Sequence, residues 1–397
     1  MENQNEMNIQ NVENEENVNL LIHIDDFKNI NAEKTKEHLY WIDCLRILAS
    51  FLVILVHSSF YALYGIQIFS KNWAYSRLWD SLGRSCVPLF IMISGALFLD
   101  PEKNIDIPKM YKKYIYRIGK ILIFWNFIYV TICKFAIDGI GVKYTWDKEL
   151  IFKIYEEMFM GKYHLWYLYM CIGLYILTPI YRAICKERVL MKYFILISLV
   201  FTQFIPNVFS LIKFFFTNRY IETIGKLVRK LNLSMVGGYS CHFILGYYLN
   251  SHQFRNKREL TIIWVVGILC QIFTYSMKLI LSKKNNKEIG EFDGYTKINV
   301  TLTSIAIFLF FKYPVKKVLT NIIQNNFFKS LLLKLSSLTF GVYQVHVCYL
   351  ELFQHLKIRY YDKNQFFLIP LHATLVWIIS AITIYIMKRT PYLKEFV

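Results

Sequence analysis

The chain has 397 residues, of which 55% are hydrophobic and 17% aromatic, and its mean hydropathy is +0.33. This composition is too apolar for a soluble domain of that length and predicts a polytopic membrane protein. The formal net charge of +18 would indicate nucleic acid in a soluble protein, but Lys and Arg stand mainly in short loops between apolar runs. In that position they orient a chain in a membrane, so we expect the lipid bilayer as a partner and no nucleic acid.

The N-terminal segment, residues 1–37, is rich in Asn and Glu and poor in aromatic residues. Such a composition predicts a disordered cytoplasmic tail. An export signal needs a basic start followed directly by an apolar run, whereas this chain begins acidic and polar. We therefore expect no cleavable signal, and a retained span in the first apolar run.

Ten apolar runs follow, each near the length that crosses a hydrocarbon core of about 30 Å. They lie at 41–62, 85–99, 117–137, 163–181, 190–212, 235–250, 260–282, 298–312, 332–355 and 366–387. The sequence thus predicts an all-α polytopic membrane bundle of about ten transmembrane helices. A transmembrane domain would occupy residues 38–390, and 391–397 would form a short cytoplasmic tail.

The distribution of positive charge predicts the orientation of the bundle. With the N-terminus inside, the inner segments hold roughly 19 Lys and Arg in about 65 residues, against roughly 18 in about 90 residues outside. Both termini are therefore expected in the cytoplasm of a multi-pass protein of the plasma membrane.

The first run contains two groups that a lipid-buried helix should exclude, Arg46 and His57. A step of eleven residues is close to three helical turns, so both lie on one helix face about 16 Å apart. Intramembrane groups of this kind mark functional sites. The alternative is that Arg46 reaches the lipid headgroups or pairs with Asp43, and that His57 is a satisfied interior histidine.

Three later stretches also combine polar residues with apolar runs. They are Gly83-Arg84-Ser-Cys-Val-Pro-Leu-Phe-Ile-Met-Ile-Ser-Gly95, the segment 163–169 with 177–180, and Leu338-Thr-Phe-Gly-Val-Tyr-Gln-Val-His346. Together with the first run they resemble, in order, four motifs of the membrane acyltransferase type 3 family. These motifs are a basic residue and a histidine with ten residues between them, a second-helix motif, a Trp-containing helix and a late Tyr-x-x-His segment. The resemblance covers nearly the whole membrane portion and is closest to the branch without an appended soluble domain.

The resemblance implies an integral membrane O-acyltransferase. Such an enzyme takes an acetyl or other short acyl group from cytoplasmic acyl-CoA, with acetyl-CoA as the expected donor and no metal. It places the group on a hydroxyl of a cell-surface or lipid-linked carbohydrate. The implied partners are the bilayer, acyl-CoA, the carbohydrate acceptor and the machinery of polysaccharide biosynthesis.

Acyl transfer needs a base or a nucleophile, and positive charge or hydrogen-bond donors for the developing oxyanion. The predicted catalytic residues are His57, His346 and Glu351. Arg46 is the predicted donor-binding residue, because its fork can hold coenzyme A phosphates near the inner surface. Arg84 and His164 are the predicted acceptor-binding residues.

Odd-numbered helices run outward and even-numbered helices run inward, so five of these groups are expected toward the outer side of the membrane. They are His57, Arg84, His164, His346 and Glu351. For three of them a plainer interpretation stays open. Arg84 would contact headgroups or neutralise Glu351, His164 would anchor the interfacial aromatic belt, and Glu351 would be a carboxylate at an outer helix end.

The remaining histidines and the cysteines carry no motif. We expect structural or interfacial roles for His242, His252, His355 and His372. Single cysteines without a Cys-x-x-Cys pair predict neither a disulfide framework nor a zinc site. These cysteines are Cys44, Cys86, Cys133, Cys171, Cys185, Cys241, Cys270 and Cys348.

Two other functions compete with acyl transfer. A transporter or exporter of a polysaccharide or lipid-linked sugar would also carry intramembrane His and Arg, although the two halves of the chain lack evident repeat symmetry. A catalytically silent membrane module would act as a scaffold or sensor. Labelled acetyl-CoA separates the three, because only an acyltransferase turns it over.

Overall fold

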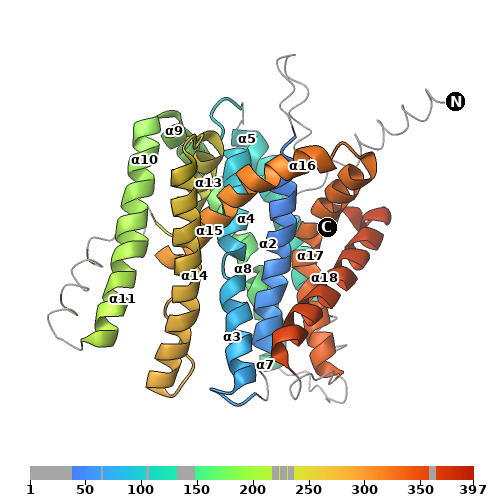
Figure 1. The fold of residues 1–397 in the computed structure, drawn as a ribbon. Helices are drawn as coiled ribbons and strands as arrows, with labels where there is room; N and C mark the ends of the chain where they lie inside the picture. Colours follow the sequence, from blue (N-terminus) through green and yellow to red (C-terminus); the bar gives the residue numbers. More distant parts are fainter. Residues whose placement is uncertain are drawn as a thin grey trace.

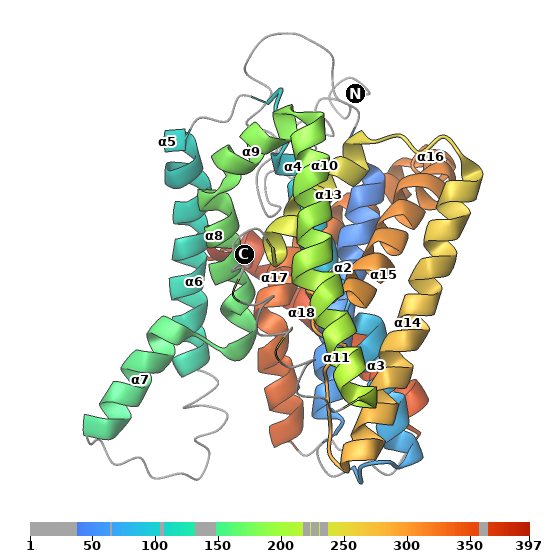
Figure 2. The ribbon, with the colours of Figure 1, turned by 90° about the vertical axis from the view of Figure 1, so that its left-hand side faces the viewer.

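The computed structural model describes residues 38–63, 66–103, 107–131, 148–216, 223, 230, 237–356 and 364–397. Within these ranges the chain is a bundle of helices and contains no strand (Figure 1, Figure 2). The predicted tail at 1–37 and Cys133 lie outside the described residues. The predicted all-α fold is confirmed for the part of the chain that the structure describes.

Seven helices in the described ranges are long and apolar enough to cross a membrane. They are α2 (Tyr40–Tyr61), α3 with α4 (Lys71–Gly83 and Cys86–Phe98), α10 with α11 (Arg188–Ile197 and Ile205–Phe215), α14 (Lys257–Asn285), α15 with α16 (Ile298–Phe310 and Lys316–Ile322), α17 (Asn326–His355) and α18 (Gln365–Arg389). The segment that ends with α8 (Trp166–Ile176) meets α9 (Thr178–Lys186) at a bend of 54°, and this bent pair would make an eighth span if it is counted as one. The polytopic bundle is therefore confirmed, whereas the predicted count of ten is not.

Two further predicted runs form helices of 13 residues each, α6 (Tyr116–Ile128) and α13 (Tyr239–Ser251). The thirteen residues of α13 span about 20 Å, which is short of the hydrocarbon core. α6 continues from a π-helical turn, η2 (Met110–Ile115). α7 (Lys148–Met160) precedes α8 and exposes several large apolar side chains.

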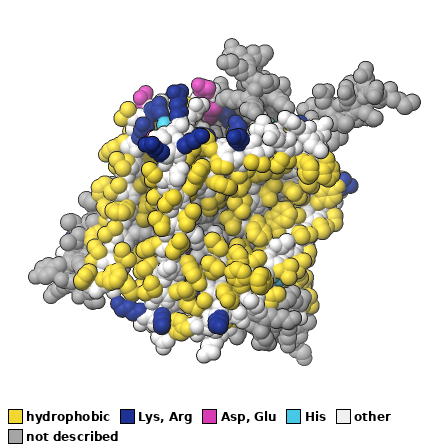
Figure 3. All heavy atoms as spheres, in the orientation of Figure 1, with side chains coloured by type: hydrophobic (Ala, Val, Ile, Leu, Met, Phe, Trp, Pro, Cys, Tyr) yellow, Lys and Arg dark blue, Asp and Glu magenta, His cyan; other side chains and the backbone are white. Residues whose placement is uncertain are grey.

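The surface of the bundle carries a broad hydrophobic belt (Figure 3). In this view Lys and Arg side chains gather along the upper rim, where α2 begins, and a few mark the lower edge. Exposed apolar side chains in the belt include Ile123, Ile262 and Phe367. A belt between two polar rims is the surface that a helical membrane protein offers to lipid.

The second span differs from the prediction. The sequence predicts a helix at 85–99 with Arg84 near the outer surface, but the structure has one span over Lys71–Phe98 whose two halves meet at Arg84 and Ser85. The polar residues of α3 lower its mean hydropathy, so a search for apolar runs does not find this first half. Ser76, Arg77 and Asp80 are nevertheless all buried. Arg84 therefore lies in the middle of a span, with thirteen helical residues before it.

α4 and α13 pack with their backbones in unusually close contact. A Cβ atom on Gly95 would lie 1.8 Å from the carbonyl oxygen of Phe243, and one on Gly246 would lie 2.0 Å from that of Met92. Only glycine fits at such distances, which is the common way for small residues to pack membrane helices. This contact fixes the short α13 against the centre of the bundle.

The last residues fold back onto the bundle. Phe396, in the short helix η8 (Lys394–Phe396), stacks on Phe124 of α6 with ring centroids 4.3 Å apart. The indole Nε1 of Trp125 donates to the Phe396 carbonyl over 3.0 Å, and Val397 is buried. The segment predicted as a short tail thus packs against α6.

Candidate functional site

α2 and α17 run parallel and touch through polar residues at two levels. At one level the Nη1 group of Arg46 donates to Ser336 Oγ over 3.1 Å. At the other level the ring centroids of His57 and His346 are 5.2 Å apart. Eleven residues separate the two levels on α2 and ten on α17, so equal helical rise keeps the two pairs in register.

Three imidazoles meet at the second level. His164, in the 3-10 turn η4 (Tyr163–Leu165), has its ring centroid 5.3 Å from that of His346. The ring of Tyr163 lies 5.5 Å from that of His57. His346 and His164 are 0% and 2% exposed, whereas His57 is half-buried. We call His57, His164 and His346 the histidine cluster.

The hydrogen bonds of two of these rings determine which nitrogen is basic. His346 Nδ1 lies 2.6 Å from the carbonyl oxygen of Tyr343, and His164 Nε2 lies 3.3 Å from that of Gln344. A carbonyl only accepts, so these nitrogens carry the proton when the rings are neutral. His346 Nε2 and His164 Nδ1 are buried and have no hydrogen-bond partner in the described chain. Each ring therefore keeps one basic nitrogen unpaired inside the protein.

Local structure holds His164 in the cluster. Gly161 adopts a φ of +72°, and an added Cβ there would lie 2.5 Å from Asn126 Oδ1. Asn126 Nδ2 donates to the carbonyl of Met158 over 2.9 Å and so ties the end of α7 to α6. The hydroxyl of Tyr343 then donates to the carbonyl of His164. A tight glycine turn and a bond from α17 thus fix the backbone of η4.

Arg46 forms the other level of the α2–α17 contact and is only 2% exposed. Its Nη1 group donates to Asp43 Oδ1 over 3.1 Å, and Ser336 Oγ donates to the same oxygen over 2.6 Å. His38 Nε2 lies 2.6 Å from the second oxygen of Asp43. The predicted pairing of Asp43 with Arg46 is therefore present, and the guanidinium is enclosed instead of facing solvent.

Further buried polar groups lie around the α2–α17 contact. The ring of Tyr167 lies 5.5 Å from that of Tyr343. Tyr343 in turn is 5.8 Å from His164 between ring centroids. Arg46 Nε and both polar atoms of the Gln344 side chain are buried without a hydrogen-bond partner in the described chain. Buried polar atoms normally have hydrogen-bond partners, so we expect water or a ligand to bind Arg46 Nε and the Gln344 side chain.

Arg84 belongs to a group of charges on α3, on α14 and on the segment that follows α14, which we call the ion cluster; its members are buried or half-buried except for the exposed Glu288. Its members are Arg77, Asp80, Arg84, Lys278, Glu288 and Asp293. Arg84 Nη2 lies 2.6 Å from Asp80 Oδ1 and 3.5 Å from Asp293 Oδ2. Lys278 binds the same two carboxylates. Three cations face three carboxylates, so the cluster is formally neutral.

The position of Arg84 decides between two of the interpretations drawn from the sequence. Arg84 pairs with Asp80 and Asp293 and not with Glu351. The partner of Glu351 is Lys162, whose Nζ lies 2.5 Å from Glu351 Oε1. The side chain of Arg84 is 22% exposed, and its guanidinium carbon lies 5.8 Å from the ring centroid of Tyr295, which is 6.0 Å from that of Trp166, directly after η4. Arg84 is therefore a fixed, compensated charge beside the histidine cluster.

Glu351 lies at the edge of the histidine cluster. Its partner Lys162 directly precedes η4, so the ion pair ties α17 to the turn that carries His164. The second oxygen, Oε2, is buried and lacks a hydrogen-bond partner in the described chain. In the described ranges, groups of His, Cys, Asp and Glu that could hold a metal ion are absent.

A comparison with protein families identifies this arrangement. The model of the acyltransferase domain family, Acyl_transf_3, matches residues 39–387. The chain belongs to this family. The match runs from α2 to α18, so the site residues of this acyltransferase all lie inside it. No significant match was found among curated proteins or among solved structures.

The family makes the protein a transferase with a multi-pass membrane domain. The expected membership of the membrane acyltransferase type 3 family is confirmed. Three residues around the candidate site were missed by sequence reasoning, namely Asp80, Lys278 and Asp293. Lys278 offered the clearest signal, because a lysine inside the apolar run at 260–282 requires a buried partner.

Three of the four histidines without a motif have neighbours in the structure. His242 Nε2 lies 2.9 Å from Thr301 Oγ1 inside the bundle. His252 stacks on Tyr248 at the end of α13, with ring centroids 5.3 Å apart. His372 lines a pocket between α2, α17 and α18. The first two contacts match the expected structural or interfacial roles.

Proposed function

We propose that the protein is an integral membrane O-acyltransferase that moves an acetyl or other short acyl group from cytoplasmic acyl-CoA to a hydroxyl of a cell-surface or lipid-linked carbohydrate. One observation carries the proposal, together with the family. Two buried imidazoles, His164 and His346, keep an unpaired basic nitrogen beside the half-buried His57. Such groups suit a reaction whose steps are proton transfers.

The chemistry assigns a task to each imidazole. A base of the cluster, which we take to be His57, removes the proton from the acceptor hydroxyl as its oxygen attacks the thioester carbonyl. The C–S bond breaks, an ester forms, and the proton passes from the imidazole to the departing thiolate. His346 and His164 hold the reacting groups and share the proton.

Charge beside the cluster would stabilise the oxyanion that forms during attack. Arg84 supplies a cation held by Asp80 and Asp293. Preorganised charge of this kind is often the largest contribution to catalysis. We assign Glu351 a positioning role, because it binds Lys162 next to η4.

The donor would approach from the Arg46 level. The sequence suggested an exposed phosphate site at Arg46, but Asp43 and Ser336 occupy its Nη1 group. We therefore propose that Arg46 Nε and the Gln344 amide contact the polar arm of the donor. The amide and thioester groups of the donor would form hydrogen bonds with these buried atoms, and the acyl group would then lie toward His164.

The proposed orientation places the start of α2 and both termini in the cytoplasm of the plasma membrane. The positive charge at the rim where α2 begins supports this orientation (Figure 3), because cytoplasmic loops carry the excess of Lys and Arg. Donor access at the Arg46 level would then be cytoplasmic, and the histidine cluster would lie toward the outer side.

An exporter of a polysaccharide or lipid-linked sugar is the second candidate. The ion cluster favours it, since buried charges mark transport and proton paths in membrane proteins. Each charge of the cluster has an opposite partner within reach, however, and this suits a fixed structure better than a moving one.

One experiment separates the two candidates. Surface polysaccharide from cells that carry the protein is de-O-acetylated with mild alkali and mixed with purified protein and radiolabelled acetyl-CoA. We expect label in the polysaccharide that mild alkali removes again, as it does from an ester. Movement of polysaccharide across proteoliposomes without incorporation of label would replace the proposal with the exporter.

A further inference from the structure

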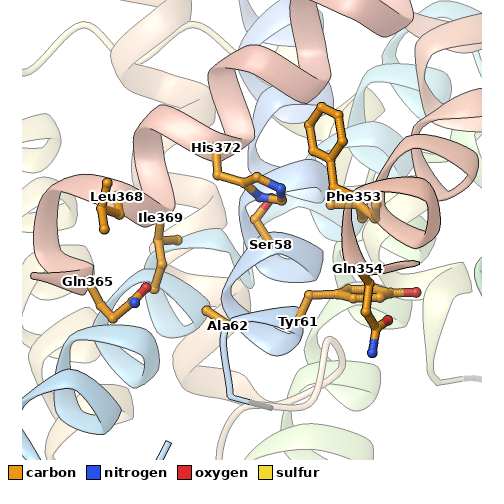
Figure 4. Close-up of a pocket in the computed structure, with 10 residues that line it drawn as sticks. Ser58, Tyr61, Ala62, Phe353, Gln354, Gln365, Leu368, Ile369 and His372 are labelled. Carbon is orange, nitrogen blue, oxygen red and sulfur yellow. The ribbon is translucent and has the colours of Figure 1, made fainter. Parts of the chain in front are cut away.

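A pocket opens between α2, α17 and α18 (Figure 4). The pocket is partly open to solvent, and its cavity volume is about 50 Å³. A water molecule needs about 10–15 Å³ of such a volume, so the pocket has room for several water molecules or a small polar ligand. Figure 4 shows His372 of α18 pointing toward Ser58 of α2, and Tyr61 lying toward Gln354 of α17.

Helical register links this pocket to the histidine cluster. Tyr61 follows His57 by four residues, and Leu350 follows His346 by four residues, and both line the pocket. Residues four apart lie on one helix face, one turn from each other. The pocket therefore begins one turn beyond the His57–His346 contact, at the level farther from Arg46.

The described lining combines polar and apolar side chains and carries no charged one. It offers a hydroxyl from Ser58, a phenol from Tyr61, amides from Gln354 and Gln365 and an imidazole from His372. Apolar side chains such as Leu350, Phe353 and Ile369 complete the wall, and Lys, Arg, Asp and Glu are absent from the described lining. Ser58 is 1% exposed, and its hydroxyl is buried without a hydrogen-bond partner in the described chain. That hydroxyl requires a polar ligand atom or a water molecule.

We propose that the pocket binds an uncharged sugar ring of the acceptor and presents one of its hydroxyls to His57. A sugar ring carries hydroxyls at its edge and C–H groups on its faces, which matches amides and hydroxyls set among apolar side chains. A phosphate or carboxylate would find no cation in the described lining, and a lipid tail would leave the buried Ser58 hydroxyl unsatisfied. This inference rests on the proposed acyl transfer.

The test measures acceptor and donor affinity separately. The acceptor is the de-O-acetylated surface polysaccharide, and the donor is acetyl-CoA. Ala62→Phe fills the pocket, and Gln354→Leu removes an amide from an exposed side chain without a folding cost. Each has a neighbour outside the lining as a matched control, Ser59→Ala on α2 and His355→Leu on α17.

We expect Gln354→Leu to raise the acceptor KM about tenfold, the effect of one lost hydrogen bond, and Ala62→Phe to raise it further. The dissociation constant for acetyl-CoA should stay within twofold, and the controls should match the wild type. An unchanged acceptor KM in both variants, or a parallel loss of acetyl-CoA affinity in correctly folded protein, would overturn the pocket assignment. Absence of transfer by the wild type would instead refute the proposed acyl transfer.

Discussion

The ion cluster offers a sharp test of the structure, because one lysine, Lys278, binds two of its carboxylates. Its Nζ group binds both Asp80 and Asp293. Lys278→Met keeps the length of the side chain and removes its charge. The cluster then changes from three cations and three carboxylates to two cations and three carboxylates.

The magnitude follows from the partners that remain after this substitution. Asp80 keeps Arg84 at 2.6 Å and Arg77 at 3.7 Å. Asp293 keeps only Arg84, at 3.5 Å, among the described residues. The uncompensated charge therefore falls on Asp293, which is 7% exposed. Removing one partner of a buried ion pair costs about 3–5 kcal/mol, and we expect a loss of that size.

Thermal unfolding in detergent micelles, followed by tryptophan fluorescence, measures the effect. The matched control is the double variant Lys278→Met with Asp293→Asn, which restores neutrality and should recover most of the lost stability. Lys278→Met with Asp80→Asn should recover less, because Asp80 also serves Arg77 and Arg84. Equal stability of the single variant and the Asp293 double variant would refute the arrangement of the cluster.

Three further predictions test the packing and the site. Gly246→Val should destabilise the protein by about 1–3 kcal/mol, because its side chain would overlap the Met92 carbonyl; thermal unfolding checks this, and Gly173→Val, at a site open on all sides, should be near neutral. Cysteines at 57 and 346, in a background without other cysteines, should be joined by a short bifunctional reagent, whereas a pair at 60 and 346 should not; failure of the first pair would contradict the histidine cluster. Arg46→Ala should weaken acetyl-CoA binding, measured by calorimetry, and Arg46→Lys should restore it only in part, since a lysine lacks Nε and the planar fork; unchanged affinity in both would remove Arg46 from the donor site.

Much of the bundle could be predicted from the sequence, because long apolar runs report membrane helices directly. α2, α14, α17 and α18 all fall within a few residues of predicted runs. The spacing from Arg46 to His57 also predicted one helix face, and the parallel α17 meets that face at both levels. Spans with regular hydropathy are thus the most predictable part of such a chain.

The second span shows where the same signal fails. α3 contains Arg77 and Asp80, which lower its hydropathy, yet both are buried against charges of α14 and of the segment that follows it. A pattern within one helix cannot report compensation by another helix. Arg84 was therefore expected at the surface, and it lies at mid-span.

The partners of individual site residues were equally beyond sequence reasoning. Glu351 pairs with Lys162, a loop residue without an apolar context. His164 depends on the turn at Gly161 and on a bond from Tyr343 of α17. The pocket at Ser58 and His372 also needs three helices to meet, so His372 carried no signal of its own.

The central claim is that His57 acts as the base for acyl transfer. The most direct measurement is the rate of acetyl transfer from radiolabelled acetyl-CoA to de-O-acetylated surface polysaccharide by purified wild-type protein and His57→Ala, with His355→Ala as a matched control. We predict a loss of about 10²–10⁴-fold for His57→Ala, the typical contribution of a general base, with unchanged thermal stability and wild-type transfer by the control. Transfer by His57→Ala at more than about half the wild-type rate would contradict the account.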